Sequence, residues 1–179
     1  MKTFIALFRG INVVGRNKLP MEQLVSILES LGLKDVETYI QSGNAVFRSK
    51  ASDATRLATK VSAAIEEARG FRPAVMLLEP RELQMAIEAN PFREGEAEPN
   101  KLHLYFLGSA PKQPDLAALQ DLASARERFA LKDRVFYLHA PDGIGRSKLA
   151  ARVEKSLGVA ATARNWRTVT RVAEMAEGD

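Results

Sequence analysis

The stretch Val36–Arg48 reads VETYIQSGNAVFR, and its pattern decides the fold of the first half of the chain. Two short runs rich in β-branched and aromatic residues, Val36–Gln41 and Ala45–Arg48, flank a Ser-Gly-Asn turn at 42–44. Glycine in such a turn adopts backbone angles that other residues avoid, and the flanking composition favours strands. The stretch therefore predicts a β-hairpin.

One helix and one strand are expected on each side of this hairpin. Before it, Thr3–Arg9 is an apolar run typical of a buried strand, and residues 20–31 carry apolar side chains at helical spacing. After it, a second helical pattern covers residues 53–69 and a strand follows at Ala74–Leu78. The order β-α-β-β-α-β predicts a ferredoxin-like plait over residues 1–92.

The second half of the chain repeats this order only in part. Residues 93–100 are acidic, small and turn-rich, and we interpret them as a linker. In residues 101–179 a strand, a helix and two further strands precede helices expected at 146–157 and 163–176. The prediction is an α+β protein whose second half is a plait-like β-α-β-β-α unit, with an extra C-terminal helix where the fourth strand would be.

The composition excludes several classes of protein. The chain has 179 residues, of which 46% are hydrophobic, so it can bury a core. It contains no cysteine, which excludes disulfides, a thiol nucleophile and thiolate metal sites. No apolar run approaches the roughly 18 to 20 residues of a membrane helix. We therefore expect a cytoplasmic protein without a membrane partner.

The positive charge of the chain is concentrated in two regions. The formal net charge is +4, but residues 1–20 carry four basic and no acidic side chains. Residues 144–171 carry seven basic side chains and a single acidic one, Glu154. Such regions favour anionic partners. A nucleotide, a phosphorylated metabolite and a nucleic acid backbone all fit them, and the sequence carries no signal for an oligomeric state.

Each basic region contains a glycine-rich segment. These segments are Arg9–Lys18, which reads RGINVVGRNK, and Pro141–Lys148, which reads PDGIGRSK. Glycine lets a backbone turn sharply and approach a ligand closely, while arginine, lysine and asparagine supply hydrogen-bond donors. We therefore predict that the protein binds a phosphate-bearing anion.

Topology joins the first segment to the hairpin turn. The first and third strands of a plait are adjacent and antiparallel, so the loop after the first strand should meet the start of the third. The residues expected to converge there are Arg9, Asn12, Lys18, Gln41, Ser42 and Asn44. The alternative is that these residues only shape a loop and a turn.

The second segment leads into a predicted helix, whose free N–H groups favour anions. The candidate ligand-binding residues in this part of the chain are Arg146, Ser147, Lys148, Arg164 and Asn165. The alternative is a capped helix start. The segment matches neither the P-loop pattern nor the dinucleotide fingerprint, so no cofactor is predicted.

Strong catalytic motifs do not occur in the sequence. Neither H-E-x-x-H nor G-x-S-x-G is found, and no metal site is predicted because His139 and Asp142 alone do not make one. Catalytic residues are therefore not assigned. One alternative hypothesis is an enzyme that uses His139, Asp142 or Ser147 on a phosphorylated or acyl substrate. Another is an interaction scaffold without a small-molecule ligand.

Five stretches match one family pattern in order along the chain. They are Leu7–Val13 (LFRGINV), Asn17–Met21 (NKLPM), Thr38–Phe47 (TYIQSGNAVF), Tyr137–Leu149 (YLHAPDGIGRSKL) and Thr162–Val169 (TARNWRTV). Together they resemble the bacterial "domain of unknown function 1697" family. That family tends to have two glycines after Asn-Val, where this chain has Val14 and Gly15. The resemblance implies a soluble bacterial α+β protein with a plait-like N-terminal part, and it implies no activity.

Overall fold

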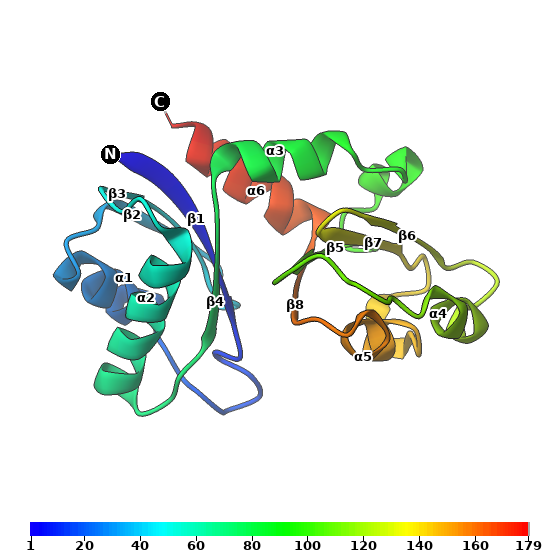
Figure 1. The fold of residues 1–179 in the computed structure, drawn as a ribbon, viewed down its shortest axis with the longest axis horizontal. Helices are drawn as coiled ribbons and strands as arrows, with labels where there is room; N and C mark the ends of the chain where they lie inside the picture. Colours follow the sequence, from blue (N-terminus) through cyan, green and yellow to red (C-terminus); the bar gives the residue numbers. More distant parts are fainter. Residues whose placement is uncertain (179) are drawn as a thin grey trace. The chain divides into compact units, whose positions relative to one another are not determined.

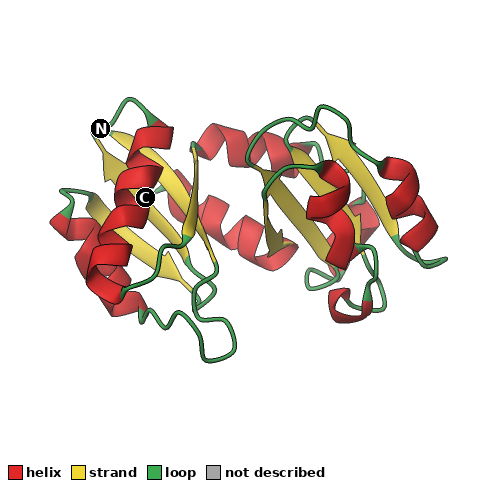
Figure 2. Ribbon diagram, turned by 60° about the horizontal axis from the view of Figure 1, so that its bottom comes forward, coloured by secondary structure: helices red, strands yellow, loops and turns green. Residues whose placement is uncertain are grey.

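The computed structural model describes residues 1–178 and divides into two compact units. Unit 1 comprises residues 1–84 together with the C-terminal residues from Arg171 onward, and unit 2 comprises Met85–Thr170. Each unit holds one four-stranded sheet, and Figures 1 and 2 show its helices and strands. In the described part of the chain, no helix is both long and apolar enough to cross a membrane.

Unit 1 has the predicted order of elements. They are β1 (Lys2–Arg9), α1 (Met21–Ser30), β2 (Lys34–Tyr39), β3 (Asn44–Ser49), α2 (Ala54–Arg69) and β4 (Ala74–Leu78). The sheet order is β2-β3-β1-β4, and all neighbouring strands are antiparallel. This arrangement is the ferredoxin-like plait, so the predicted hairpin and N-terminal fold are confirmed.

Helices α1 and α2 cover one face of the unit 1 sheet. Alternate residues of the two central strands point toward these helices and form the core: Phe4, Ala6, Phe8, Ala45 and Phe47 pack with Leu24, Leu28, Leu57, Val61 and Ile65. The opposite face of β1 is also apolar, since Ile5 and Leu7 are buried as well. This burial on both faces explains why Thr3–Arg9 is a continuous apolar run instead of an alternating one.

Unit 2 contains a second complete plait. Its elements are β5 (Leu102–Leu107), α4 (Leu116–Leu122), β6 (Arg128–Lys132), β7 (Val135–His139), α5 (Val153–Leu157) and β8 (Ala161–Asn165). The sheet order β6-β7-β5-β8 repeats the order of the first sheet. The α+β fold class with two plait-like halves is therefore confirmed. The second half is more regular than predicted, because it has a fourth strand.

The fourth strand, β8, corrects the prediction of a helix from residue 163. Ala161–Asn165 pairs with β5 in antiparallel register, with Thr162 opposite Phe106 and Arg164 opposite Leu104. The last helix, α6 (Trp166–Glu177), begins only after this strand. Its first turn is capped by Asn165, whose Oδ1 accepts a hydrogen bond from the Thr168 N–H at 2.9 Å.

The helix predicted over residues 146–157 is interrupted. The segment contains two short 3₁₀ helices, η2 (Ile144–Arg146) and η3 (Ala150–Arg152). Only the five residues of α5 are α-helical. Ser147 separates the two 3₁₀ turns in an extended conformation, and its Oγ accepts a hydrogen bond from the Ala150 N–H at 3.0 Å. The serine thus caps a helical turn that begins later than the sequence predicted.

Residues between the two plaits also form regular structure. Helix α3 (Pro80–Glu88) is followed by η1 (Arg93–Ala97), which occupies most of the segment interpreted as a linker. In unit 2, the Tyr137 hydroxyl donates a hydrogen bond to the Ala86 carbonyl oxygen at 2.6 Å. Gly95 is buried against the His139 ring. These contacts fix residues 86–95 on the face of β7 that lies opposite Phe136 and Leu138.

Candidate functional site

The predicted meeting of the glycine-rich loop and the hairpin turn is confirmed within unit 1. Leu7 near the end of β1 pairs with Asn44 at the start of β3. The side chain of Asn12 then crosses from the loop to the turn, where its Nδ2 donates a hydrogen bond to the Gln41 carbonyl oxygen at 2.8 Å. The loop and the turn are therefore held side by side at one end of the two central strands.

Asn12 acts as the anchor of this arrangement. Its Nδ2 also donates to the Leu19 carbonyl oxygen at 2.9 Å, and its Oδ1 accepts from the Leu19 N–H at 2.8 Å. Its backbone has a φ of 51°, which asparagine tolerates better than most residues. Both amide hydrogens are thus bonded to the protein itself, so Asn12 has no donor left for a ligand.

Asn44 is likewise engaged in the turn. Its side chain is fully buried, and Nδ2 donates to the Tyr39 carbonyl oxygen at 2.9 Å and to the Ser42 Oγ at 3.4 Å. The expected turn-shaping alternative therefore applies to Asn12 and Asn44. The polar side chains predicted for the site that remain at the surface of unit 1 are those of Arg9, Lys18, Gln41 and Ser42.

The tip of the loop carries an exposed hydrophobic residue. Val14 is 97% exposed and has a φ of 39°, a conformation that is strained for a β-branched side chain. Gly15 follows it at a φ of 76°. Val14 thus occupies a backbone conformation suited to glycine, at the position where this chain departs from the family pattern.

In unit 2, the three consecutive residues Arg146, Ser147 and Lys148 line one cavity of about 350 Å³. Gly143, at a φ of 96°, lies in the same wall, as do Asp142 and Glu127. Asp142 pairs with Arg126, and Glu127 accepts a hydrogen bond from the Ser124 N–H at 2.8 Å. Both carboxylates therefore have partners inside the protein.

The two cations of this cavity, Arg146 and Lys148, have no comparable partners. Within residues 1–178, neither the Arg146 guanidinium nor the Lys148 ammonium forms an ion pair or side-chain hydrogen bond, and both residues are exposed. Ser147 adds a hydroxyl group between them in the sequence. The cavity consequently presents two available positive charges and a hydroxyl group beside a glycine turn.

Arg164 and Asn165 lie elsewhere in unit 2, on β8, and are not among the residues that line this cavity. Burial lowers the pKa of the Arg164 guanidinium to about 10, and its Nη1 donates to the Ala163 carbonyl oxygen at 2.9 Å. The Asn165 Oδ1 caps α6. The predicted unit 2 residues thus divide into a cavity group and a strand group.

The two histidines are buried inside unit 2. His139 packs against Phe92, with ring centroids 6.3 Å apart, and against Gly95. His139 Nε2 and His103 Nδ1 have no hydrogen-bond partner among the described residues. His139 is not among the residues that line the cavity of Arg146 and Lys148. No group of three potential metal ligands occurs in residues 1–178.

Because His103 is buried, we expect the stability of the folded protein to depend on pH. Desolvation lowers its pKa from 6.5 to about 4, so the unfolded chain binds a proton more readily than the folded chain. This contribution to stability is present above about pH 6.5 and is lost as the pH falls toward 4. Between pH 7 and pH 5 we expect a loss of about 2 kcal/mol, measured by urea unfolding. His103→Leu should flatten this part of the profile; an unchanged slope would contradict the assignment.

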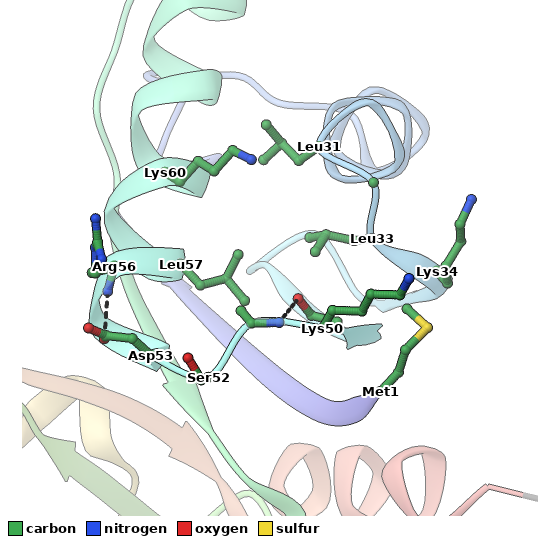
Figure 3. A pocket seen from close by; sticks show the side chains of 13 residues that line it. Met1, Leu31, Leu33, Lys34, Lys50, Ser52, Asp53, Arg56, Leu57 and Lys60 are labelled. Carbon is green, nitrogen blue, oxygen red and sulfur yellow. Dashed lines mark hydrogen bonds between the residues drawn. The ribbon is translucent and has the colours of Figure 1, made fainter.

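A larger cavity lies in unit 1, at residues that the sequence did not single out (Figure 3). Its volume is about 880 Å³, and it lies between the end of α1 and the start of α2. The basic residues in its wall are Lys34, Lys50, Arg56 and Lys60. These residues are separated by up to 26 positions in the sequence and do not belong to a glycine-rich segment. No local motif therefore predicts that they line one cavity.

The comparisons with known proteins agree with this architecture. Two ferredoxin-like plaits in one chain define a double-plait α+β protein. Residues 1–137 match the family described as "Protein of unknown function (DUF1697)", and the chain belongs to this family. The matched residues include the Arg9–Lys18 loop and the hairpin turn, whereas Arg146–Lys148 lie beyond them.

A solved structure covers both plaits. It is described as a conserved bacterial protein, SP0830, from Streptococcus pneumoniae, and it is similar to this chain with a TM-score of 0.75 and 25% sequence identity. The similarity covers 97% of this chain and 98% of that one. No curated protein matches the chain. These relatives establish the family and the fold, and their descriptions assign no ligand.

Proposed function

We propose that the protein binds a small phosphate-bearing ligand, and that Arg146 and Lys148 neutralise its phosphate group in the unit 2 cavity. The observation that carries the proposal is the shared cavity of about 350 Å³ lined by Arg146, Ser147 and Lys148. An arginine guanidinium binds two phosphate oxygens at once, and a lysine ammonium adds a point charge. The Ser147 hydroxyl would orient the bound group.

The size of the cavity favours a metabolite over a polymer. A volume near 350 Å³ falls at the small end of the range of about 300–1,000 Å³ that is usual for ligand pockets. A nucleic acid backbone, by contrast, binds along an extended surface with many cations. In unit 1, the exposed Lys18 offers a further contact for an anion. The expected location stays the cytoplasm.

Lys148→Ala and Arg146→Ala test this proposal. Each removes a charge-assisted contact worth about 1.5–3 kcal/mol, so each should weaken binding of the best phosphorylated ligand about tenfold or more. Isothermal titration calorimetry measures this, after a thermal-shift screen of inorganic phosphate, sugar phosphates and nucleotides has selected the ligand. Lys112→Ala is the matched control, because Lys112 is an exposed cation outside this cavity.

Three results would contradict the proposal. The first is the absence of any thermal shift across the screen. The second is that both cavity variants bind the ligand as tightly as the unsubstituted protein, and the third is that the Lys112→Ala control loses as much affinity as they do. Titration at increasing salt separates the polymer alternative, because binding to a nucleic acid backbone weakens steeply with salt. If a short RNA bound with a steep salt dependence and no metabolite bound, the ligand would be a nucleic acid and the small-ligand proposal would be wrong.

A further inference from the structure

We infer that unit 1 holds a separate binding site, for an organic phosphate that carries an aromatic or aliphatic body, in the cavity between α1 and α2 (Figure 3). The proposed function concerns a different cavity with different residues. The inference rests on three features of the unit 1 cavity: its charge, its apolar wall and its size.

The charge of the wall favours an anion. Four basic side chains, those of Lys34, Lys50, Arg56 and Lys60, line the cavity together with a single carboxylate, that of Asp53. Asp53 is occupied locally, because its Oδ1 accepts the Arg56 N–H at 3.0 Å and caps α2. The wall therefore carries an excess of three positive charges.

The basic side chains of this cavity are not paired with carboxylates. Within the described residues, none of the four forms an ion pair or a side-chain hydrogen bond. Cations of the same unit outside the cavity do pair, as in Arg48–Asp35 at 3.3 Å and Arg72–Glu66 at 2.7 Å. Unpaired cations around one concave surface raise the local positive potential and attract anions.

The apolar part of the wall that a ligand could contact comes from Leu31, which is partly buried, and from Met1, which is 51% exposed. Leu33, which follows the end of α1, and Leu57, in the first turns of α2, also line the cavity but are buried in the unit 1 core. In Figure 3 the Lys60 side chain reaches toward Leu31, while Lys50 extends along the opposite side toward Met1. A ligand that contacts both the basic and the apolar side chains of the wall needs an anionic end and an apolar body.

The volume agrees with a ligand of this class. A cavity of about 880 Å³ is much larger than a phosphate group needs and lies within the range usual for organic ligands. Inorganic phosphate would leave the surface of Leu31 and Met1 in contact with water. A nucleoside monophosphate has both parts, and AMP is therefore the probe.

Calorimetric titration of the full chain with AMP, adenosine and inorganic phosphate tests the inference. We expect AMP to bind more tightly than either of its two parts. A Lys50→Ala/Lys60→Ala double variant should bind AMP at least tenfold more weakly, since two charge-assisted contacts are lost. Arg48→Ala is the matched control, because Arg48 is a cation of the same unit that does not line the cavity.

Lys148→Ala separates this inference from the proposed function. If AMP affinity falls in the double variant and persists in Lys148→Ala, the unit 1 cavity is the site. If AMP affinity is unchanged in the double variant, or AMP binds no more tightly than adenosine and phosphate, the inference is overturned. NMR of the unsubstituted protein gives a second readout, in which AMP should shift the amide signals of residues 31–34 and 49–60. The absence of shifts there would also overturn it.

Discussion

Gly43→Ala is expected to lower the free energy of unfolding by about 3 kcal/mol. Gly43 has a φ of 89°, where an L-residue is strained by roughly 1–2 kcal/mol. A Cβ placed on Gly43 would also meet the Ile11 Cδ1 atom and lie 2.9 Å from the Phe8 Cβ. Phe8 and Ile11 are buried core residues, so neither can move without disturbing the packing. Chemical denaturation with urea measures the loss.

Gly15→Ala separates the two causes of this loss. Gly15 has a similar φ of 76°, but a Cβ there would have no neighbour within 4 Å. Gly15→Ala should therefore cost only the backbone term, about 1 kcal/mol. The difference between the two variants reports the steric clash with Phe8 and Ile11. Equal losses in both variants would show that the close approach of the turn to the core is not a constraint.

Asn12→Ala is expected to lower the free energy of unfolding by about 3 kcal/mol, again measured by urea denaturation. The change removes hydrogen bonds to the Gln41 carbonyl oxygen and to both backbone groups of Leu19. Leu19 is fully buried, so its N–H and carbonyl groups would lose their partner away from water. Alanine would also occupy the unfavourable φ of 51°.

Asn17→Ala provides the comparison for Asn12. Asn17 has the same φ of 51° and is exposed, and its Nδ2 makes a hydrogen bond to the Gly10 carbonyl oxygen at 2.7 Å. Its replacement should cost about 1–2 kcal/mol, less than that of Asn12. If the Asn12 variant kept its stability yet lost ligand binding, Asn12 would be a ligand contact and its structural role would be refuted.

Local sequence patterns predicted the N-terminal plait well because its elements carry strong local signals. The hairpin has a glycine turn between two β-rich runs, and α2 has both an Asp53 cap and a Gly70 stop. β8 lacks such a signal, since Ala161–Asn165 contains two alanines, an arginine and an asparagine. That segment is a strand because it pairs with the apolar β5, a contact between residues far apart in the chain.

For the candidate sites too, local sequence patterns predicted only part of what the structure shows. The convergence of the Arg9–Lys18 loop with the hairpin turn followed from strand order, and the Asn12–Gln41 hydrogen bond confirms it. Which groups stay available did not follow from the sequence. Asn12 and Asn44 had the expected donor chemistry, but these donors are bonded to backbone oxygens, and only packing determines that.

The sequence by itself determined the family, the α+β class and the order of elements in the first plait, because glycine turns, helix caps and apolar periodicity act over a few residues. The tertiary structure alone decided that the second sheet has a fourth strand and that Lys34, Lys50 and Lys60 surround one cavity. Those features depend on residues from separate segments meeting in space. Such long-range contacts follow from the burial of the whole core, and no short stretch of the sequence carries a pattern that predicts them.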